Sequence, residues 1–134
     1  MQQLESVTLI DSLYATFLRG DLNAILDIVS DDTEWIVYGP EELEITGEFR
    51  GPSGVKQFLE ALIATQDEIK VEITDRIAQG NKVVAIGEYS TRIKATGKRA
   101  SIPIAHVWTI EEGKITRLLD FFDTAAAKAA YSPS

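Results

Sequence analysis

One histidine and one carboxylate stand out as the residues best suited to acid–base chemistry. His106 is the only histidine of the chain, and it lies in a segment rich in β-formers. Asp120 lies between Leu118–Leu119 and Phe121–Phe122. An ionisable group at such a buried strand position is costly unless it has a partner or a task. Because a carboxylate can serve as a general base and an imidazole can assist it, His106 and Asp120 are the candidate catalytic residues.

The two residues can meet only if their strands pair in a suitable register. The segment Glu111–Gly113 separates the strands, and its glycine suits the left-handed position of a three-residue hairpin loop. With that loop, His106 opposes Leu118 and Ile104 opposes Asp120, so His106 and Asp120 are diagonal neighbours on one face. A two-residue turn would place them on opposite faces. The glycine therefore favours the three-residue loop.

Composition limits the classes of protein to consider. With 134 residues, 45% hydrophobic and 25% charged, the chain predicts one domain, 1–134, with a substantial core. The net charge of −8 argues against nucleic-acid and anionic-membrane partners. Absence of cysteine and the single histidine exclude thiolate metal sites and make a zinc site improbable, so no metal is expected. Without a signal-peptide or membrane-spanning pattern, we expect a cytoplasmic protein.

Apolar residues at helical spacing predict three helices in the first half of the chain. The first runs from Leu4 to about Gly20, the second follows an N-cap at Asp21, and the third opens at Gly51–Pro52. Between the last two we expect, in order, a turn at Ser30–Asp32, a strand at Thr33–Tyr38, and a loop at Gly39–Arg50 with a short strand near Phe49.

After Gln66 the hydrophobic pattern changes to period two, which predicts an antiparallel meander of four strands at about 69–79, 82–95, 98–110 and 114–122. The tail, Thr124–Ser134, is expected to form a short helix or a frayed end. Helices followed by a curved antiparallel sheet indicate an α+β fold in which helices cover one face of the sheet.

The turns before the candidate site also fix which residues surround it. A two-residue turn at Thr96–Gly97 would place Gly87 opposite His106 and Tyr89 opposite Ile104, with the phenol near the carboxylate. In the preceding hairpin, a two-residue turn at Gly80–Asn81 would put polar residues on the same apolar face. We therefore expect a bulge or an odd-length loop in that hairpin.

Several segments together resemble a known family. A first strand that contains Trp35, the segment GEFRGPSGVKQFL at 47–59, and the ending HVWTIEEGKITRLLDFFD at 106–123 are similar to the SnoaL-like polyketide cyclases. These belong to the wider NTF2-like superfamily, with ketosteroid isomerase, limonene-1,2-epoxide hydrolase and nuclear transport factor 2. The resemblance covers about residues 4–124. It implies an NTF2-like cone, in which three helices pack on a curved, mainly antiparallel sheet around an apolar pocket.

The resemblance also assigns roles to particular residues. The polyketide cyclases use an aspartate on the last strand as general base and a histidine on the preceding strand, which match Asp120 and His106. Ketosteroid isomerase has its base on the first strand, where this chain has the sequence of residues 36–38, Ile-Val-Tyr. The last-strand aspartate of the epoxide hydrolases matches Asp120, but their Arg and Asp partners fall at Gly87 and Tyr89. That loss argues against epoxide opening.

These observations together predict a small-molecule enzyme that needs no cofactor. We expect an isomerase or cyclase that abstracts a proton next to a carbonyl, or a hydrolase that activates water, acting on a small apolar carbonyl- or hydroxyl-bearing molecule. The alternative is a non-catalytic small-ligand-binding or structural dimerisation module of the same fold. The residues expected to contact substrate are Tyr14, Phe17, Trp35, Phe58, Tyr89, Ile104, Trp108, Leu118 and Phe122.

The opposite face of the sheet predicts self-association. If His106 faces inward, then Val107, Ile115, Leu119 and Phe121 point outward from adjacent strands. Such an apolar patch is unusual for a monomer. A homodimer with twofold symmetry would cover it.

Overall fold

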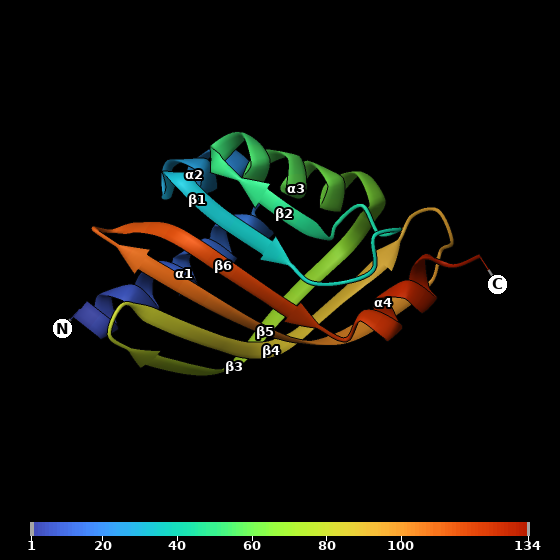
Figure 1. The fold of residues 1–134 in the computed structure, drawn as a ribbon. Coiled ribbons are helices and arrows are strands. Elements are labelled where there is room, and N and C mark those ends of the chain that lie inside the picture. Colours follow the sequence, from blue (N-terminus) through green and yellow to red (C-terminus); the bar gives the residue numbers. More distant parts are fainter. Residues whose placement is uncertain (1, 134) are drawn as a thin grey trace.

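A single curved sheet with helices on its concave side makes up the molecule in the computed structural model, which describes residues 2–133 (Figure 1). The expected α+β cone is confirmed with its three predicted helices, and the tail forms a short helix, one of the two alternatives expected for it. In chain order the elements are α1 (Gln2–Leu18), α2 (Leu22–Asp27), β1 (Val29–Val37), β2 (Gly47–Arg50), α3 (Gly51–Thr65), β3 (Gln66–Gln79), β4 (Lys82–Ile93), β5 (Arg99–Glu111), β6 (Lys114–Phe122) and α4 (Thr124–Tyr131).

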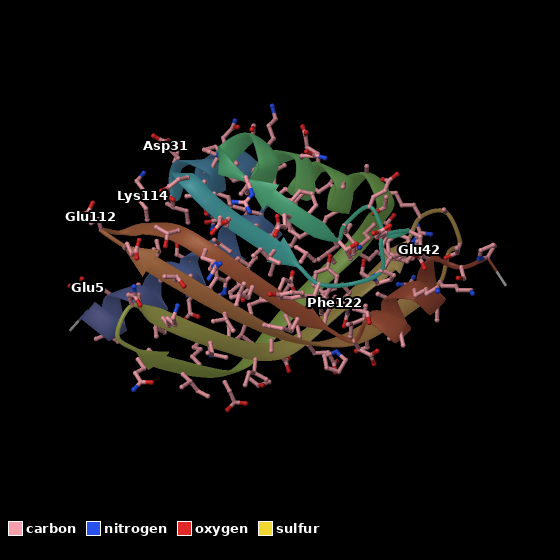
Figure 2. The ribbon with its side chains drawn as sticks, viewed as in Figure 1. Glu5, Asp31, Glu42, Glu112, Lys114 and Phe122 are labelled. Carbon is pink, nitrogen blue, oxygen red and sulfur yellow. The ribbon has the colours of Figure 1, made fainter. Side chains whose placement is uncertain are left out.

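The sheet has the strand order β2-β1-β6-β5-β4-β3. Its pairs are antiparallel except β1 with β6, which run parallel. Helix α1 packs against β3 and β4, α3 packs against β1 and β2, and α4 lies against β5 at the opposite end (Figure 1). The labelled charged side chains Glu5, Asp31, Glu112 and Lys114 lie at the outer edge of the molecule in Figure 2. The core therefore occupies the space between the helices and the concave face.

Local signals explain most element boundaries, with one exception. Asp21 caps α2, since its carboxylate accepts a hydrogen bond from the Ala24 amide at 3.2 Å. The short strand predicted near Phe49 is present as β2. The predicted turn at Ser30–Asp32 is wrong, because these residues belong to β1. The pairing of β1 with β6 is irregular at these residues. The strand nevertheless continues through them, and the residues on either side, Val29 and Thr33, are buried.

The hairpin of β5 and β6 differs from the predicted three-residue loop. Glu111 pairs with Lys114, so the turn contains only Glu112 and Gly113, both at positive φ (52° and 74°). This is the conformation of a two-residue type I′ turn. The partner of Thr109 is Arg117 and that of Ile110 is Ile115, which leaves residue 116 as an extra residue in a bulge.

A two-residue turn alone would have put His106 and Asp120 on opposite faces of the sheet. The extra residue in the bulge returns them to the same face. His106 therefore pairs directly with Asp120, and not with Leu118 as predicted. The prediction that the two candidate residues share a face is confirmed, although they are direct rather than diagonal neighbours. Between the bulge and the turn, the side chains of β6 lie on the face opposite to the one predicted. Ile115 is therefore fully buried, and the prediction that it points outward is wrong.

In the hairpin of β4 and β5, by contrast, the loop is longer than the predicted two-residue turn. The Ile93 amide donates to the Lys98 carbonyl at 2.8 Å, and the Gly97 amide donates back to the Ile93 carbonyl at 2.7 Å. Residues 94–97 therefore form a four-residue loop. As a consequence Ala85, rather than Gly87, lies opposite His106, which corrects the predicted neighbour of the imidazole.

Bulges in the hairpin of β3 and β4 were expected and are confirmed. The turn is at residues 80–81 as predicted, but the register shifts between Ile73 and Asp75 and again between Asp67 and Lys70. The shift between Ile73 and Asp75 places Val71 opposite Tyr89, so apolar and aromatic residues of both strands face the core. The extra residues bring the backbone of β3 close to Gly87, where a side chain would not fit.

Candidate functional site

An elongated cavity lies between the concave face of the sheet and the helices. The volume within which the centre of a water molecule could be placed is about 100 Å³. One water molecule needs roughly 10–15 Å³ of such space, so the cavity is larger than a site for a single water. Every predicted site residue contributes to its lining: His106, Asp120, Tyr14, Phe17, Trp35, Phe58, Tyr89, Ile104, Trp108, Leu118 and Phe122. Their catalytic and binding roles stay predictions.

Four of these residues form a polar group at one end of the cavity, named here the His106 cluster: Tyr14, His106, Trp108 and Asp120. The Tyr14 hydroxyl lies 2.6 Å from His106 Nδ1, and it accepts a hydrogen bond from Trp108 Nε1 at 3.1 Å. His106 Nε2 lies 3.1 Å from Asp120 Oδ1. Tyr14 reaches this position because it belongs to the inward stripe of α1, with Ile10 one turn before it.

The hydrogen-bonding capacities of these groups suggest an assignment of the protons. An indole N–H can only donate, so the Tyr14 oxygen is the acceptor for Trp108, and we assign the hydroxyl proton of Tyr14 to the bond with His106 Nδ1. The neutral imidazole then carries its proton on Nε2, the nitrogen that faces Asp120. Burial raises the pKa of the Tyr14 phenol far above its usual value, which keeps this donor protonated.

Asp120 is the unusual member of the cluster. The residue is only 9% exposed, and its Oδ1 atom has no hydrogen-bond partner among the described residues. The nearby His106 Nε2 is within ion-pair distance of Oδ1, but its N–H is not aligned well enough for a hydrogen bond. Proteins seldom leave a buried polar atom without a partner, and a bound ligand can supply the missing donor.

Aromatic rings form the wall beside this cluster. Trp35 lies edge-to-face with Trp108 at 5.6 Å between ring centroids and contacts Phe58 at 5.9 Å. Trp35 is 3% exposed, and its indole Nε1 also has no hydrogen-bond partner in the described part of the chain. Two residues of the cavity lining thus have an unpartnered polar atom among the described residues, an acceptor in Asp120 and a donor in Trp35.

A second polar group, named here the Gln66 cluster, consists of Gln66, Tyr89, Thr91 and Tyr131. The Tyr89 hydroxyl donates to Gln66 Oε1 at 2.6 Å and does not bond to Asp120. Gln66 Oε1 also accepts from Thr91 at 3.0 Å, and Gln66 Nε2 donates to the Tyr131 hydroxyl at 2.7 Å. Burial is the main cause that raises the pKa of the Tyr89 phenol, with smaller contributions from Tyr131 and Asp120.

Sequence reasoning missed three members of the Gln66 cluster. Gln66 marked only the change from helical to strand periodicity, and Tyr131 lay in a tail without a predicted role. Their contact joins positions 65 residues apart, which no local pattern reveals. The one available signal was the junction itself, because a polar residue between an apolar helix and a strand is often buried at the layer boundary.

Two further findings limit the kinds of site to consider. Within residues 2–133 no group of three or more His, Cys, Asp or Glu side chains is arranged to hold a metal ion. No helix in this part of the chain has the length and apolar character needed to cross a membrane.

Comparison with known proteins adds a family and several relatives. Residues 10–118 match the model of the SnoaL-like domain. An uncharacterised protein of Mycobacterium tuberculosis is 28% identical over 123 residues, which is 92% of each chain. An NTF2-like protein from Burkholderia xenovorans has a similar crystal structure, with a TM-score of 0.87, 25% identity and coverage of 97% of this chain and 98% of that one.

One similar crystal structure contains a named small molecule. TerC, co-crystallised with polyporic acid, is 29% identical to this chain, with a TM-score of 0.83. The match covers 94% of this chain and 97% of TerC.

Proposed function

Because this chain belongs to the SnoaL-like family, we propose that its cavity is the active site of a cofactor-independent enzyme in which Asp120 is the general base. The observation that carries the proposal is the Asp120 carboxylate itself: a buried acceptor with an unpartnered oxygen, in a cavity lined mainly by apolar and aromatic side chains. A positioned carboxylate of this kind abstracts a proton next to a carbonyl. The chemistry is therefore that of an isomerase or a cyclase.

The proposed reaction begins with transfer of a proton from the α-carbon of the substrate to Asp120. The electron pair of the broken C–H bond forms a C=C bond, and the carbonyl π pair moves onto oxygen to give an enolate. In the isomerisation of a β,γ-unsaturated ketone the enolate is a conjugated dienolate, and Asp120 returns the proton to its γ-carbon, so that the C=C bond moves into conjugation with the re-formed carbonyl. In a cyclisation the enolate carbon attacks a second carbonyl, and the proton goes to the new alkoxide. The unpartnered Trp35 Nε1 would donate to the enolate oxygen.

His106 is assigned a positioning role in this mechanism. Its Nδ1 bonds to the Tyr14 hydroxyl, and its Nε2 lies 3.1 Å from Asp120 Oδ1, beside the proposed base. The Tyr14–His106 pair holds the imidazole N–H toward the carboxylate and thereby orients the base. Loss of His106 is expected to lower the rate less than loss of Asp120, because the base itself remains.

The proposed substrate is a flat, mostly apolar molecule that carries a carbonyl. The lining near Asp120 consists of aromatic and aliphatic side chains, which bind such molecules by burial of apolar surface. TerC, a relative of the same fold, was crystallised with polyporic acid. That complex supports a small-molecule ligand for this chain as well.

The test measures proton abstraction without knowledge of the natural product. The probe is 2-tetralone in D₂O, and the rate of deuterium incorporation at its α-carbons is followed by NMR. We expect wild-type protein to accelerate the exchange, and Asp120→Asn to lower the catalysed rate by about 10²–10⁴-fold. The matched control is Asp31→Asn, an exposed carboxylate that is not in the lining.

Two outcomes would contradict the proposal. Full exchange activity in Asp120→Asn would remove the base from its role. Absence of any acceleration by wild-type protein, together with a small molecule found by mass spectrometry in the purified protein, would favour the alternative of a non-catalytic binding module.

The outer sheet face supports a proposal about assembly, namely a homodimer. Tyr38 and Phe121 are each 43% exposed and stack on one another at 4.8 Å, and Ile86 is 37% exposed on the same sheet. Val107 on β5 and Leu119 on β6 are half-buried. A second copy would cover this face symmetrically. Sedimentation is expected to give a dimer for wild-type protein and a monomer for Phe121→Glu, whereas a wild-type monomer at micromolar concentration would contradict the proposal.

A further inference from the structure

The Gln66 cluster lies at the other end of the cavity from the His106 cluster. Ala85 faces His106 across β4 and β5, and Tyr89 is four residues farther along β4 on the same face. At about 3.3 Å per residue, the backbone positions of Ala85 and Tyr89 are roughly 13 Å apart along β4. Between them the lining is apolar, with Ile104 paired to Phe122. The cavity therefore has two polar ends separated by an apolar section.

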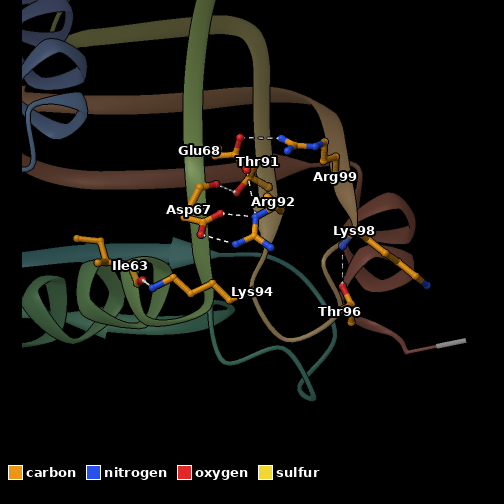
Figure 3. A network of polar contacts seen from close by, with 9 residues as sticks. All are labelled: Ile63, Asp67, Glu68, Thr91, Arg92, Lys94, Thr96, Lys98 and Arg99. Carbon is orange, nitrogen blue, oxygen red and sulfur yellow. Dashed lines mark hydrogen bonds and ion pairs between the residues drawn. The ribbon is translucent and has the colours of Figure 1, made fainter.

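The Gln66 side chain is held in this position by its neighbours in the chain. Gln66 is 4% exposed and pairs with Ile93 at the start of β3. Directly after it the strand is bulged, with Glu68 at a φ of 52°. Ion pairs fix this bulge from the outside: Asp67 binds the guanidinium of Arg92 at 2.6 and 2.9 Å, and Glu68 contacts Arg92 and Arg99 (Figure 3).

Thr91 connects this outer network to the cavity. Its hydroxyl is within hydrogen-bond distance of both the Asp67 carbonyl, at 3.4 Å, and Gln66 Oε1, at 3.0 Å (Figure 3 shows the contact with Asp67). Thr91 is itself 4% exposed. A polar group this buried and this well supported is a built feature of the cavity rather than a surface contact.

The hydrogen bonds within the cluster determine what it can still bind. The Tyr89 and Thr91 protons go to Gln66 Oε1. Thr65 donates to the Ala61 carbonyl at 2.8 Å, so the Tyr131 hydroxyl, 2.9 Å from Thr65, donates to it. What remains is one N–H of Gln66 Nε2 as a donor, with the free lone pairs of the hydroxyl oxygens as acceptors.

We propose that the Gln66 cluster binds a neutral hydroxyl group at the end of the substrate remote from Asp120. A hydroxyl both accepts and donates, so it can use the free Gln66 N–H and the Tyr89 oxygen together. A carbonyl can use only the N–H. The described lining contains neither Lys nor Arg, so a carboxylate or phosphate would be buried there without a counter-charge. The inference rests on the proposed function and deepens it: the substrate class is an apolar ketone with a hydroxyl on the order of 10 Å from its carbonyl.

The test compares two probes that differ by a single hydroxyl, 4-acetylbiphenyl and 4-acetyl-4′-hydroxybiphenyl, by calorimetric titration. We expect wild-type protein to bind the hydroxylated probe about 5- to 10-fold more tightly, the effect of roughly one neutral hydrogen bond. In Gln66→Leu/Tyr89→Phe, which replaces both partners by apolar groups of similar shape, the preference should fall below about twofold. The affinity of this variant for 4-acetylbiphenyl reports whether its cavity is intact. Asp120→Asn should keep the hydroxyl preference, because it alters the other end of the cavity.

The outcomes separate this inference from the proposed function. Equal binding of both probes by wild-type protein would overturn the hydroxyl site and leave the general base untouched. A preference that persists in the double variant would also overturn it, because the hydroxyl would then be bound elsewhere. Failure of wild-type protein to bind either probe would count against both proposals.

Discussion

Replacement of Tyr14 by phenylalanine should have a large effect on stability for so small a change. The hydroxyl is hydrogen-bonded to both the Trp108 indole and the His106 imidazole, and Tyr14 and Trp108 are 8% and 2% exposed. Its removal leaves a buried N–H and a buried ring nitrogen without partners. At roughly 1–2 kcal/mol for each, the free energy of unfolding should fall by about 2–4 kcal/mol.

Urea and thermal unfolding both measure this loss. For a chain of this length the entropy of unfolding is about 0.28 kcal/mol/K, so the melting temperature should fall by roughly 7–14 °C. Tyr38→Phe is the matched control, because Tyr38 is 43% exposed and its stacked contact with Phe121 survives the change. A surface substitution of this kind should alter the unfolding free energy by less than about 0.5 kcal/mol.

The single histidine offers a second, independent measurement. Its two ring nitrogens give one set of ¹⁵N NMR signals, which should report an unprotonated Nδ1 and a protonated Nε2 in the wild-type protein. In Tyr14→Phe the Nδ1 hydrogen bond is gone, and its signal should move. A variant as stable as wild type, or an imidazole protonated on Nδ1, would refute the assigned hydrogen-bond chain.

Two further predictions concern stability. Gly87→Ala should unfold the protein or lower its free energy of unfolding by several kcal/mol, because an added Cβ would lie 2.0 Å from the Glu72 carbonyl oxygen and 2.8 Å from Ile73 Cα. A melting curve by circular dichroism that matches wild type would contradict this close approach of the β3 backbone to Gly87. Because burial raises the pKa of the Tyr14 and Tyr89 phenols, the unfolded chain binds fewer protons than the folded one above about pH 10, and stability should fall as the pH rises from there, by up to about 1.4 kcal/mol per pH unit for each tyrosine. Urea unfolding between pH 9 and pH 11.5 measures this slope, and a flat profile would contradict the burial of both phenols.

The candidate site could be predicted in part. The three-residue loop predicted from Gly113 put His106 and Asp120 on one face, and the observed two-residue turn gives the same result only because residue 116 is an extra residue in a bulge. The register itself could not be predicted. Gly113 is compatible with both two- and three-residue turns, and nothing in the type of residue 116 signals a bulge.

The Gln66 cluster could not be predicted for a different reason. It depends on two separate features. The four-residue loop at 94–97 places Tyr89 opposite Ile102 rather than Ile104, and the two bulges in β3 set which residues of β3 lie opposite β4, including Gln66 opposite Ile93. Each of these features is small. Their combined displacement, however, moves the Tyr89 phenol from Asp120 to Gln66.

The strand order has a consequence for how the chain is made. Of the six described strands β6 is the last to be synthesised, yet it lies between β1 and β5 near the middle of the sheet. Until it leaves the ribosome, β1 with β2 and the meander of β3 to β5 are two fragments, each with an unpaired edge that can pair with other chains. Asp120 belongs to this joining strand. Closure of the sheet and completion of the His106 cluster are therefore one late event in biosynthesis, and a nascent chain arrested before β6 would lack both.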